Sequence, residues 1–125
     1  RGPRRGNCGA DPRPHPPDLT STVRYLILSD IHANLEALET VLAESPPGSY
    51  DRVVVLGDLV GYGADPNAVV DRVRGLDPLA VIRGNHDKAA CGLDDGSSFN
   101  QVARFAAAWT SDTLTPDNRQ CRPVR

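Results

Sequence analysis

Several residue types that mark particular protein classes are scarce in this chain of 125 residues. It has no methionine, its aromatic content is 5%, and its three cysteines are odd in number and widely spread. Such cysteine usage predicts neither a disulfide framework nor a zinc knuckle, and a reducing cytoplasm is the simplest compartment. The low aromatic content predicts a modest core of valine, leucine and alanine.

An excess of basic residues and long apolar runs are also lacking. The formal net charge is −2 and the pI is about 5.9, which gives no support to electrostatic binding of nucleic acid. No apolar run approaches the roughly 20 residues that cross a bilayer, and no apolar segment of a signal peptide follows the N-terminal arginines. We therefore expect neither a membrane nor a nucleic acid as partner.

Composition divides the chain into three parts. Residues 1–21 are rich in proline, glycine and arginine, a composition that buries little apolar surface, and we expect a disordered tail there. Residues 22–118 carry the apolar patterns of one folded domain, and residues 119–125 carry no clear pattern. His15 lies within the first tail and is not expected to bind a metal.

Three short apolar runs alternate with two segments of helical periodicity. Residues 23–29, 51–56 and 79–82 predict strands, and their nearly continuous apolar character is typical of strands that are covered on both faces. Helices are expected after Asn34, a candidate N-cap, and after Asp65, a candidate N-cap that is followed by proline. This order predicts an α/β fold with right-handed β-α-β units and a parallel sheet.

A last helix is expected from apolar residues at helical spacing near the C-terminus. One face of it would carry Phe99, Val102, Phe105, Ala106 and Trp109. Because no basic residues cluster beside these side chains, a place in the core is favoured over the stacking of nucleic-acid bases.

A polar cluster follows each predicted strand. Asp30 and His32 follow the first strand, Asp58 follows the second, and Asn85 and His86 follow the third. Ligands of parallel α/β sheets bind beyond the carboxyl ends of the strands, so these side chains would converge on one edge. Two carboxylates, an imidazole and an amide oxygen suit divalent ions such as manganese, iron or zinc.

Each of these residues also has an ordinary structural explanation. An aspartate that follows a strand usually caps a turn or a helix. Three such clusters are harder to obtain from turn chemistry, so a metal site is the favoured interpretation. If Asp58 bridges two ions about 3.5–4 Å apart, the ions activate a water for attack at phosphorus. His86 would then protonate the leaving oxygen.

Three motifs resemble those of the calcineurin-like metallophosphoesterase superfamily, especially the N-terminal half of its bacterial phosphodiesterase-like branch. They are SDIHANLEAL at residues 29–38, GDLVGYG at residues 57–63 and RGNHD at residues 83–87. The resemblance covers about residues 23–118. It implies a fold of parallel β-α-β units that forms about half of the family's α/β sandwich.

The resemblance implies a role for each residue of the three clusters. Asp30 and His32 would bind the first metal ion, Asp58 would bridge both ions, and Asn85 would bind the second. His86 would assist the departure of the leaving group. The implied cofactors are two divalent metal ions, and the implied substrate is a small phosphoester.

Three neighbouring residues have less defined roles by the same resemblance. Asp87 is expected to orient His86. Arg83 is as consistent with a structural role as with contact to an anionic substrate. Tyr62 either lines the substrate mouth or packs within its loop, and packing is the favoured alternative.

Two departures from the family pattern narrow the expected function. Protein phosphatases of the superfamily continue the second motif with Asp-Arg-Gly, whereas this chain reads Gly61-Tyr62-Gly63, so a small phosphodiester or phosphomonoester is the expected substrate. The family also completes both metal sites with histidines from its C-terminal half, and this sequence has no histidine after His86. Each ion would then have fewer protein ligands and bind more weakly.

Two hypotheses follow from these observations. The first is a metal-dependent phosphoesterase, represented here by its N-terminal half. The alternative is a truncated or degenerate chain that retains weak metal or phosphate binding without catalysis. In both cases the absence of the second sheet would leave one face of the parallel sheet open, an apolar patch that favours self-association.

Overall fold

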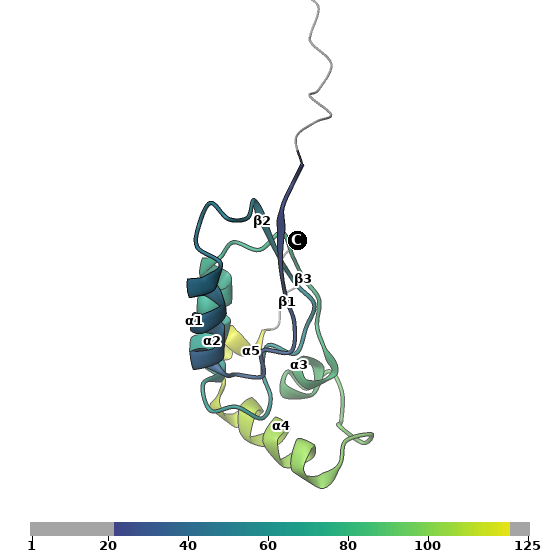
Figure 1. Cartoon of the computed structure of the whole chain (residues 1–125). Coiled ribbons are helices and arrows are strands. Elements are labelled where there is room, and N and C mark those ends of the chain that lie inside the picture. The colour runs from purple at the N-terminus through teal and green to yellow at the C-terminus, as the bar shows by residue number, and fades with distance from the viewer. Residues whose placement is uncertain (1–21, 121–125) are drawn as a thin grey trace, which may run out of the picture.

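Three parallel strands and two connecting helices form the centre of the fold (Figure 1). The computed structural model describes residues 22–120, so the predicted tail at residues 1–21 and residues 121–125 lie outside the described residues. The strands are β1 (Tyr25–Leu28), β2 (Arg52–Val55) and β3 (Ala80–Val81), in the order β1-β2-β3. The helices α1 (Leu35–Glu44) and α2 (Pro66–Gly75) lie on the same side of this sheet. The predicted α/β fold with parallel strands is confirmed.

Three further helices follow the sheet in the chain: α3 (Asn85–Ala90), α4 (Gln101–Thr113) and α5 (Pro116–Arg119). Both α3 and α4 lie beyond the carboxyl ends of the strands (Figure 1). The sequence predicted neither α3, whose first three residues belong to the third motif, nor the single turn of α5.

Local capping fixes where the first helix begins. The Asn34 side chain accepts a hydrogen bond from the Ala37 backbone N–H at 3.0 Å, as expected for an N-cap. Pro66 opens α2 as predicted, but the side chain of the preceding Asp65 makes no capping hydrogen bond. Proline is favourable at this position because its fixed φ angle suits the first helical turn.

The core lies between the sheet and the helices α1 and α2. The parallel register places Leu26 opposite Val53 and Leu28 opposite Val55, so these side chains share the face that the helices cover. The buried residues of this core are Leu28, Leu38, Leu42, Val53, Val55, Val69 and Val73.

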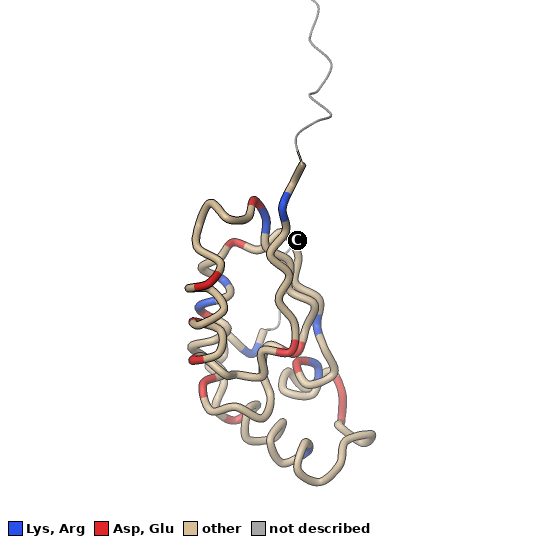
Figure 2. The backbone as a smooth tube through the Cα atoms, viewed as in Figure 1, with Lys and Arg blue, Asp and Glu red and all other residues tan. Residues whose placement is uncertain are grey.

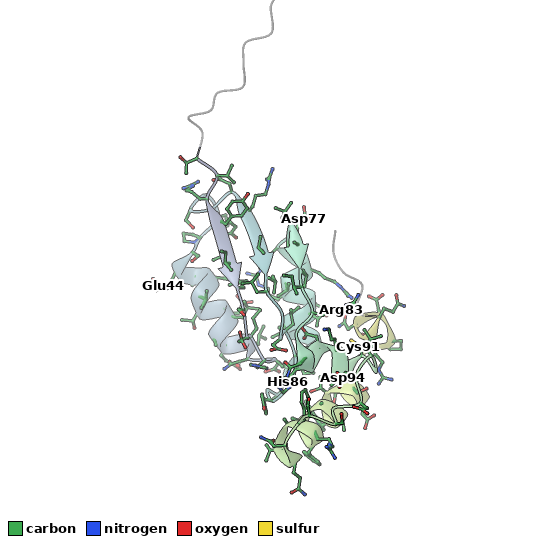
Figure 3. All side chains as sticks on the ribbon, turned by 90° about the vertical axis from the view of Figure 1, so that its right-hand side faces the viewer. Glu44, Asp77, Arg83, His86, Cys91 and Asp94 are labelled. Carbon is green, nitrogen blue, oxygen red and sulfur yellow. The ribbon has the colours of Figure 1, made fainter. Side chains whose placement is uncertain are left out.

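The opposite face of the sheet is open within the described residues. Tyr25, Ile27, Leu56 and Ile82 alternate with the core residues along the strands and remain between 46% and 60% exposed. Figure 3 shows this face toward the viewer, with α1 and α2 behind the strands. The expectation of strands covered on both faces is therefore wrong for residues 22–120.

The helix α4 turns small residues inward rather than the predicted aromatic ones. Ala103 and Ala107 are buried, whereas Val102, Phe105 and Trp109 are 70%, 75% and 42% exposed. The predicted core face of this helix is therefore wrong. Small side chains on the inner face allow a close approach to the neighbouring helices α2 and α3, which α4 contacts.

Two further observations concern membrane spans and cysteine pairing. None of the helices in residues 22–120 is long and apolar enough to cross a membrane. Cys91, at the C-terminal end of α3, is disulfide-bonded. The cysteine spacing gave no indication of this bond, and the expectation of no disulfide is wrong at this residue.

Candidate metal centre

The loops that follow β1 and β2 bring three candidate metal ligands together. Asp30, His32 and Asp58 each offer one ligand atom, and these atoms all lie within 4.8 Å of one another. The Nε2 atom of His32 lies 3.6 Å from Oδ1 of Asp30. The predicted convergence of these residues at the carboxyl edge of the sheet is therefore seen in the structure.

The hydrogen bond of His32 leaves one ring nitrogen available to a metal. Its Nδ1 lies 3.3 Å from the backbone oxygen of Val60. Because a carbonyl oxygen can only accept, Nδ1 is the donor and Nε2 keeps its lone pair. Metal-binding histidines commonly donate their second nitrogen to a carbonyl in this way. Two carboxylates and such an imidazole fit a divalent cation of the manganese, iron or zinc type.

The candidate ligands share an uncommon backbone conformation. Asp30, His32 and Asp58 have φ angles of 54°, 49° and 51°. Ala33 and Tyr62, in the same two loops, have φ angles of 55° and 64°. This left-handed region is unfavourable for residues with a Cβ atom, and such strain persists only where the surroundings fix it.

Backbone hydrogen bonds between the two loops fix this conformation. We call this set of three bonds the inter-loop ladder. The donors and acceptors are Asp30 N and Gly57 O (3.1 Å), His32 N and Asp58 O (2.9 Å), and Ala33 N and Leu59 O (2.8 Å). The ladder continues the pairing of β1 with β2 past the ends of the strands and holds the two segments that carry the candidate ligands side by side.

The third motif packs against Asp58. The backbone N–H of His86 donates to Oδ1 of Asp58 at 3.0 Å. A Cβ atom on Gly84 would lie only 2.0 Å from the same oxygen, so this close approach requires glycine. Asn85, the first residue of α3, lies between Gly84 and His86 in the chain and is exposed.

The carboxylate of Asp87 holds two loops together. Its oxygens accept the backbone N–H of Val60 at 3.2 Å and that of Gly84 at 2.9 Å. Burial raises the pKa of Asp87, and these two hydrogen bonds oppose the rise. The hydrogen bonds give Asp87 a role in loop structure, beside its predicted role in orienting His86.

His86 is enclosed by aromatic rings. It is 7% exposed, and its Nδ1 has no hydrogen-bond partner among residues 22–120. Burial lowers the pKa of its imidazole, against the opposing charge of Asp58. The ring stacks on Phe99, with centroids 4.6 Å apart and planes inclined by 28°. Sequence reasoning missed Phe99 as a site residue, because no sequence signal links two positions 13 residues apart.

A cavity of about 550 Å³ opens beside the candidate ligands. Its charged lining residues are the acidic Asp30, Glu36 and Asp65, and no lysine or arginine lines it. Figure 2 shows acidic positions on the loops at this end of the sheet. Tyr62 also lines the cavity and is 52% exposed, and its ring packs against His32 and His86, so the structure is compatible with both alternatives for this residue.

Arg83 does not line this cavity. Its Nε atom is buried without a hydrogen-bond partner among the described residues. The structural alternative for Arg83 is therefore favoured over direct contact with a substrate in the cavity. Figure 3 shows Arg83 on the segment between β3 and α3.

The fold and the donor set together define an α/β protein with a candidate site for divalent metal ions at the carboxyl edge of its sheet. Residues 23–119 match the family model of calcineurin-like phosphoesterases, and the chain belongs to this family.

The relatives that this chain matches are about twice as long as the chain. The uncharacterized protein MJ0912 of Methanocaldococcus jannaschii is 40% identical over 92 residues, which are 74% of this chain and 37% of that protein. A metallophosphoesterase from Sphaerobacter thermophilus has 46% identity and a TM-score of 0.64, with 80% of this chain and 40% of that chain covered. A putative diadenosine tetraphosphatase has 30% identity and a TM-score of 0.60, with 83% and 42% covered. The chain thus spans less than half of each relative, in agreement with an N-terminal half of the family fold.

Proposed function

We propose that this chain provides part of a phosphoesterase centre with two divalent cations. Asp30 and His32 would hold the first ion, Asp58 both ions, and Asn85 the second, and His86 would protonate the leaving oxygen. The observation that carries the proposal is the grouping of the ligand atoms of Asp30, His32 and Asp58 within 4.8 Å. When bound, manganese, iron or zinc ions neutralise phosphate charge and activate water for attack at phosphorus.

The residues of the chain have distinct tasks in this proposal. The Nδ1 contact to Val60 would keep Nε2 of His32 available to an ion. The backbone N–H of His86 orients the Asp58 carboxylate. Since Nδ1 of His86 is buried against Gly61, Nε2 is the nitrogen that would transfer a proton to the leaving oxygen.

We propose a small phosphodiester or phosphomonoester as the substrate. A cavity of about 550 Å³ has the size of a small-molecule site. Its carboxylates repel a phosphate, and Tyr62 supplies no positive charge where protein phosphatases of the superfamily carry arginine. Binding of the substrate would therefore depend on the cations, and removal of the cations would weaken binding as well as hydrolysis.

The second candidate function is metal or phosphate binding without catalysis. The observation in favour of this function is the small number of ligands: the group of carboxylates and imidazoles found among residues 22–120 has three members. Catalytic ions usually have about three protein ligands each, so two ions would share an incomplete set.

Metal binding and hydrolysis can be tested on the same preparation. Titration calorimetry should show that Mn²⁺ binds to the chain. The substitution Asp58→Asn should lower the Mn²⁺ affinity by at least about 100-fold, which is more than the loss of affinity expected for a residue that only supports a ligand. The control is Asp77→Asn, because Asp77 has a similar φ of 49° but does not belong to the ligand group. Equal affinity in both variants would contradict the site.

Hydrolysis of bis(p-nitrophenyl) phosphate with Mn²⁺ distinguishes the two functions. Turnover that is lost on chelation and in Asp58→Asn supports the phosphoesterase. Tight Mn²⁺ binding without turnover at saturating ion supports the non-catalytic alternative instead.

We also propose that the open sheet face, formed by Tyr25, Ile27, Leu56 and Ile82, mediates self-association. Four large apolar side chains on one face form a patch of the kind that marks interaction sites. The cytoplasmic location and the absence of membrane and nucleic-acid partners stay predictions.

A further inference from the structure

The imidazole of His86 has no polar anchor on its buried side. Its Nδ1 is inaccessible and makes no hydrogen bond within residues 22–120. Residue 61 is glycine, and a Cβ atom there would lie 2.6 Å from this nitrogen. No side chain at position 61 can therefore accept a hydrogen bond from the ring. The orientation of His86 depends on packing instead.

Three aromatic rings pack around His86, and they differ in their geometry and in their other contacts. His32 contacts it edge-on at a centroid distance of 5.0 Å and is itself a candidate metal ligand. Tyr62 is tilted by 48° at 4.6 Å and is half exposed in the cavity. Phe99 is the stacked neighbour, with an angle of 28° between the planes. Phe99 is therefore the flat wall against which the imidazole lies.

The loop before α4 holds Phe99 in this place. The backbone N–H of Phe99 donates to the Gly96 oxygen at 2.9 Å, and Asn100 directly after it caps α4 through the Ala103 N–H at 2.9 Å. An apolar residue before an N-cap often packs on the fourth helical residue, but that residue is Arg104 here. Helix capping thus does not explain a phenylalanine at position 99.

We propose that Phe99 is a positioning residue for His86. Its ring fixes the plane of the imidazole by stacking, so that Nε2 faces the leaving oxygen while Nδ1 stays against Gly61. The catalytic part of this inference rests on the proposed role of His86. The packing part rests on the contacts of the described residues alone.

The packing part can be tested by NMR without any activity. The chain has three histidines, so the ring signals of His86 can be assigned with His86→Gln. The wild type should show NOEs between the His86 ring and the Gly61 α-protons, and Phe99→Leu should weaken them while Phe99→Tyr retains them. The control is Phe105→Leu, because Phe105 is 75% exposed on α4. Unchanged NOEs in Phe99→Leu would overturn the proposal.

The catalytic part is tested with two phosphate esters that differ in their leaving group. A p-nitrophenolate departs without protonation, whereas an alkoxide needs an acid that protonates it. The substitution Phe99→Leu should therefore lower kcat for the alkyl ester by about 10-fold or more, and it should lower kcat for the nitrophenyl ester far less. Phe99→Tyr should restore the alkyl activity. Equal losses on both esters would indicate a general structural role and overturn the positioning role.

The two experiments also separate this inference from the proposed function. If the wild type hydrolyses neither ester with saturating Mn²⁺, the phosphoesterase function fails for this chain as it stands. In that case the NOEs still decide whether Phe99 orients His86. Retained NOEs in Phe99→Leu would reject the inference whatever the activity.

Discussion

A methyl group at position 84 would collide with a candidate metal ligand. A Cβ atom on Gly84 would lie 2.0 Å from Oδ1, 2.4 Å from Cγ and 2.6 Å from the backbone nitrogen of Asp58. Rotation of the carboxylate cannot relieve the third contact, because it involves the backbone. In Gly84→Ala one of the two loops must therefore move by about 1 Å to restore normal contact distances.

Two effects set the size of the loss of stability in Gly84→Ala. Overpacking of a tight site costs about 1–3 kcal/mol. The same movement would disrupt the 3.0 Å hydrogen bond from His86 to the Asp58 carboxylate, and such bonds to charged groups contribute about 1.5–3 kcal/mol. We expect the free energy of unfolding to fall by about 2.5–6 kcal/mol. Mn²⁺ affinity should fall about 10-fold or more.

Urea unfolding followed by circular dichroism gives the first quantity, and titration calorimetry gives the second. The matched control is Gly75→Ala at the end of α2, where a Cβ atom would meet nothing within 4 Å. That variant should match the wild type or gain up to about 1 kcal/mol. A Gly84→Ala protein with wild-type affinity and a loss below about 1 kcal/mol would refute the close packing of the third motif on Asp58.

Two further predictions concern the sheet. Ile27→Thr on the open face should reduce self-association in sedimentation experiments, while Val102→Thr on α4 should not; equal effects of both would contradict an interface at the sheet. Hydrogen bonds from Arg24 lower the pKa of Asp51 in the folded protein. The stabilisation from this pair is therefore present above about pH 4, and it is lost as the pH falls through the lowered pKa of Asp51 in the folded state. The difference in unfolding free energy between wild type and Asp51→Asn should therefore shrink between pH 6 and pH 3, and a constant difference would show that the pair contributes nothing.

Features that depend on local chemistry could be predicted from the sequence. Asn34 accepts the Ala37 N–H as an N-cap whatever the rest of the chain does. The apolar runs end where the polar clusters begin, and parallel pairing then places Asp30 and Asp58 at the same edge. These predictions required a strand pattern and a topology rule, without knowledge of distant contacts.

Features that depend on contacts between distant segments could not be predicted. Apolar residues lie on more than one side of α4, so periodicity alone could not show that Ala103 and Ala107 face inward while Phe105 faces out. The left-handed conformations of Asp30 and His32 arise from bonds to another loop, and no glycine at these positions announces them. The stacking of Phe99 on His86 has the same non-local origin.

The inter-loop ladder has a consequence for how this chain can change in length. Each of its bonds pairs one residue after β1 with one residue after β2, so an inserted or deleted residue in either loop would shift the candidate ligands out of alignment. The turns at the other end of the sheet, around Gly48 and Asp77, contain no candidate ligand. Insertions in natural relatives or in designed variants should therefore accumulate at that end, while the loops that carry Asp30 and Asp58 keep a fixed length.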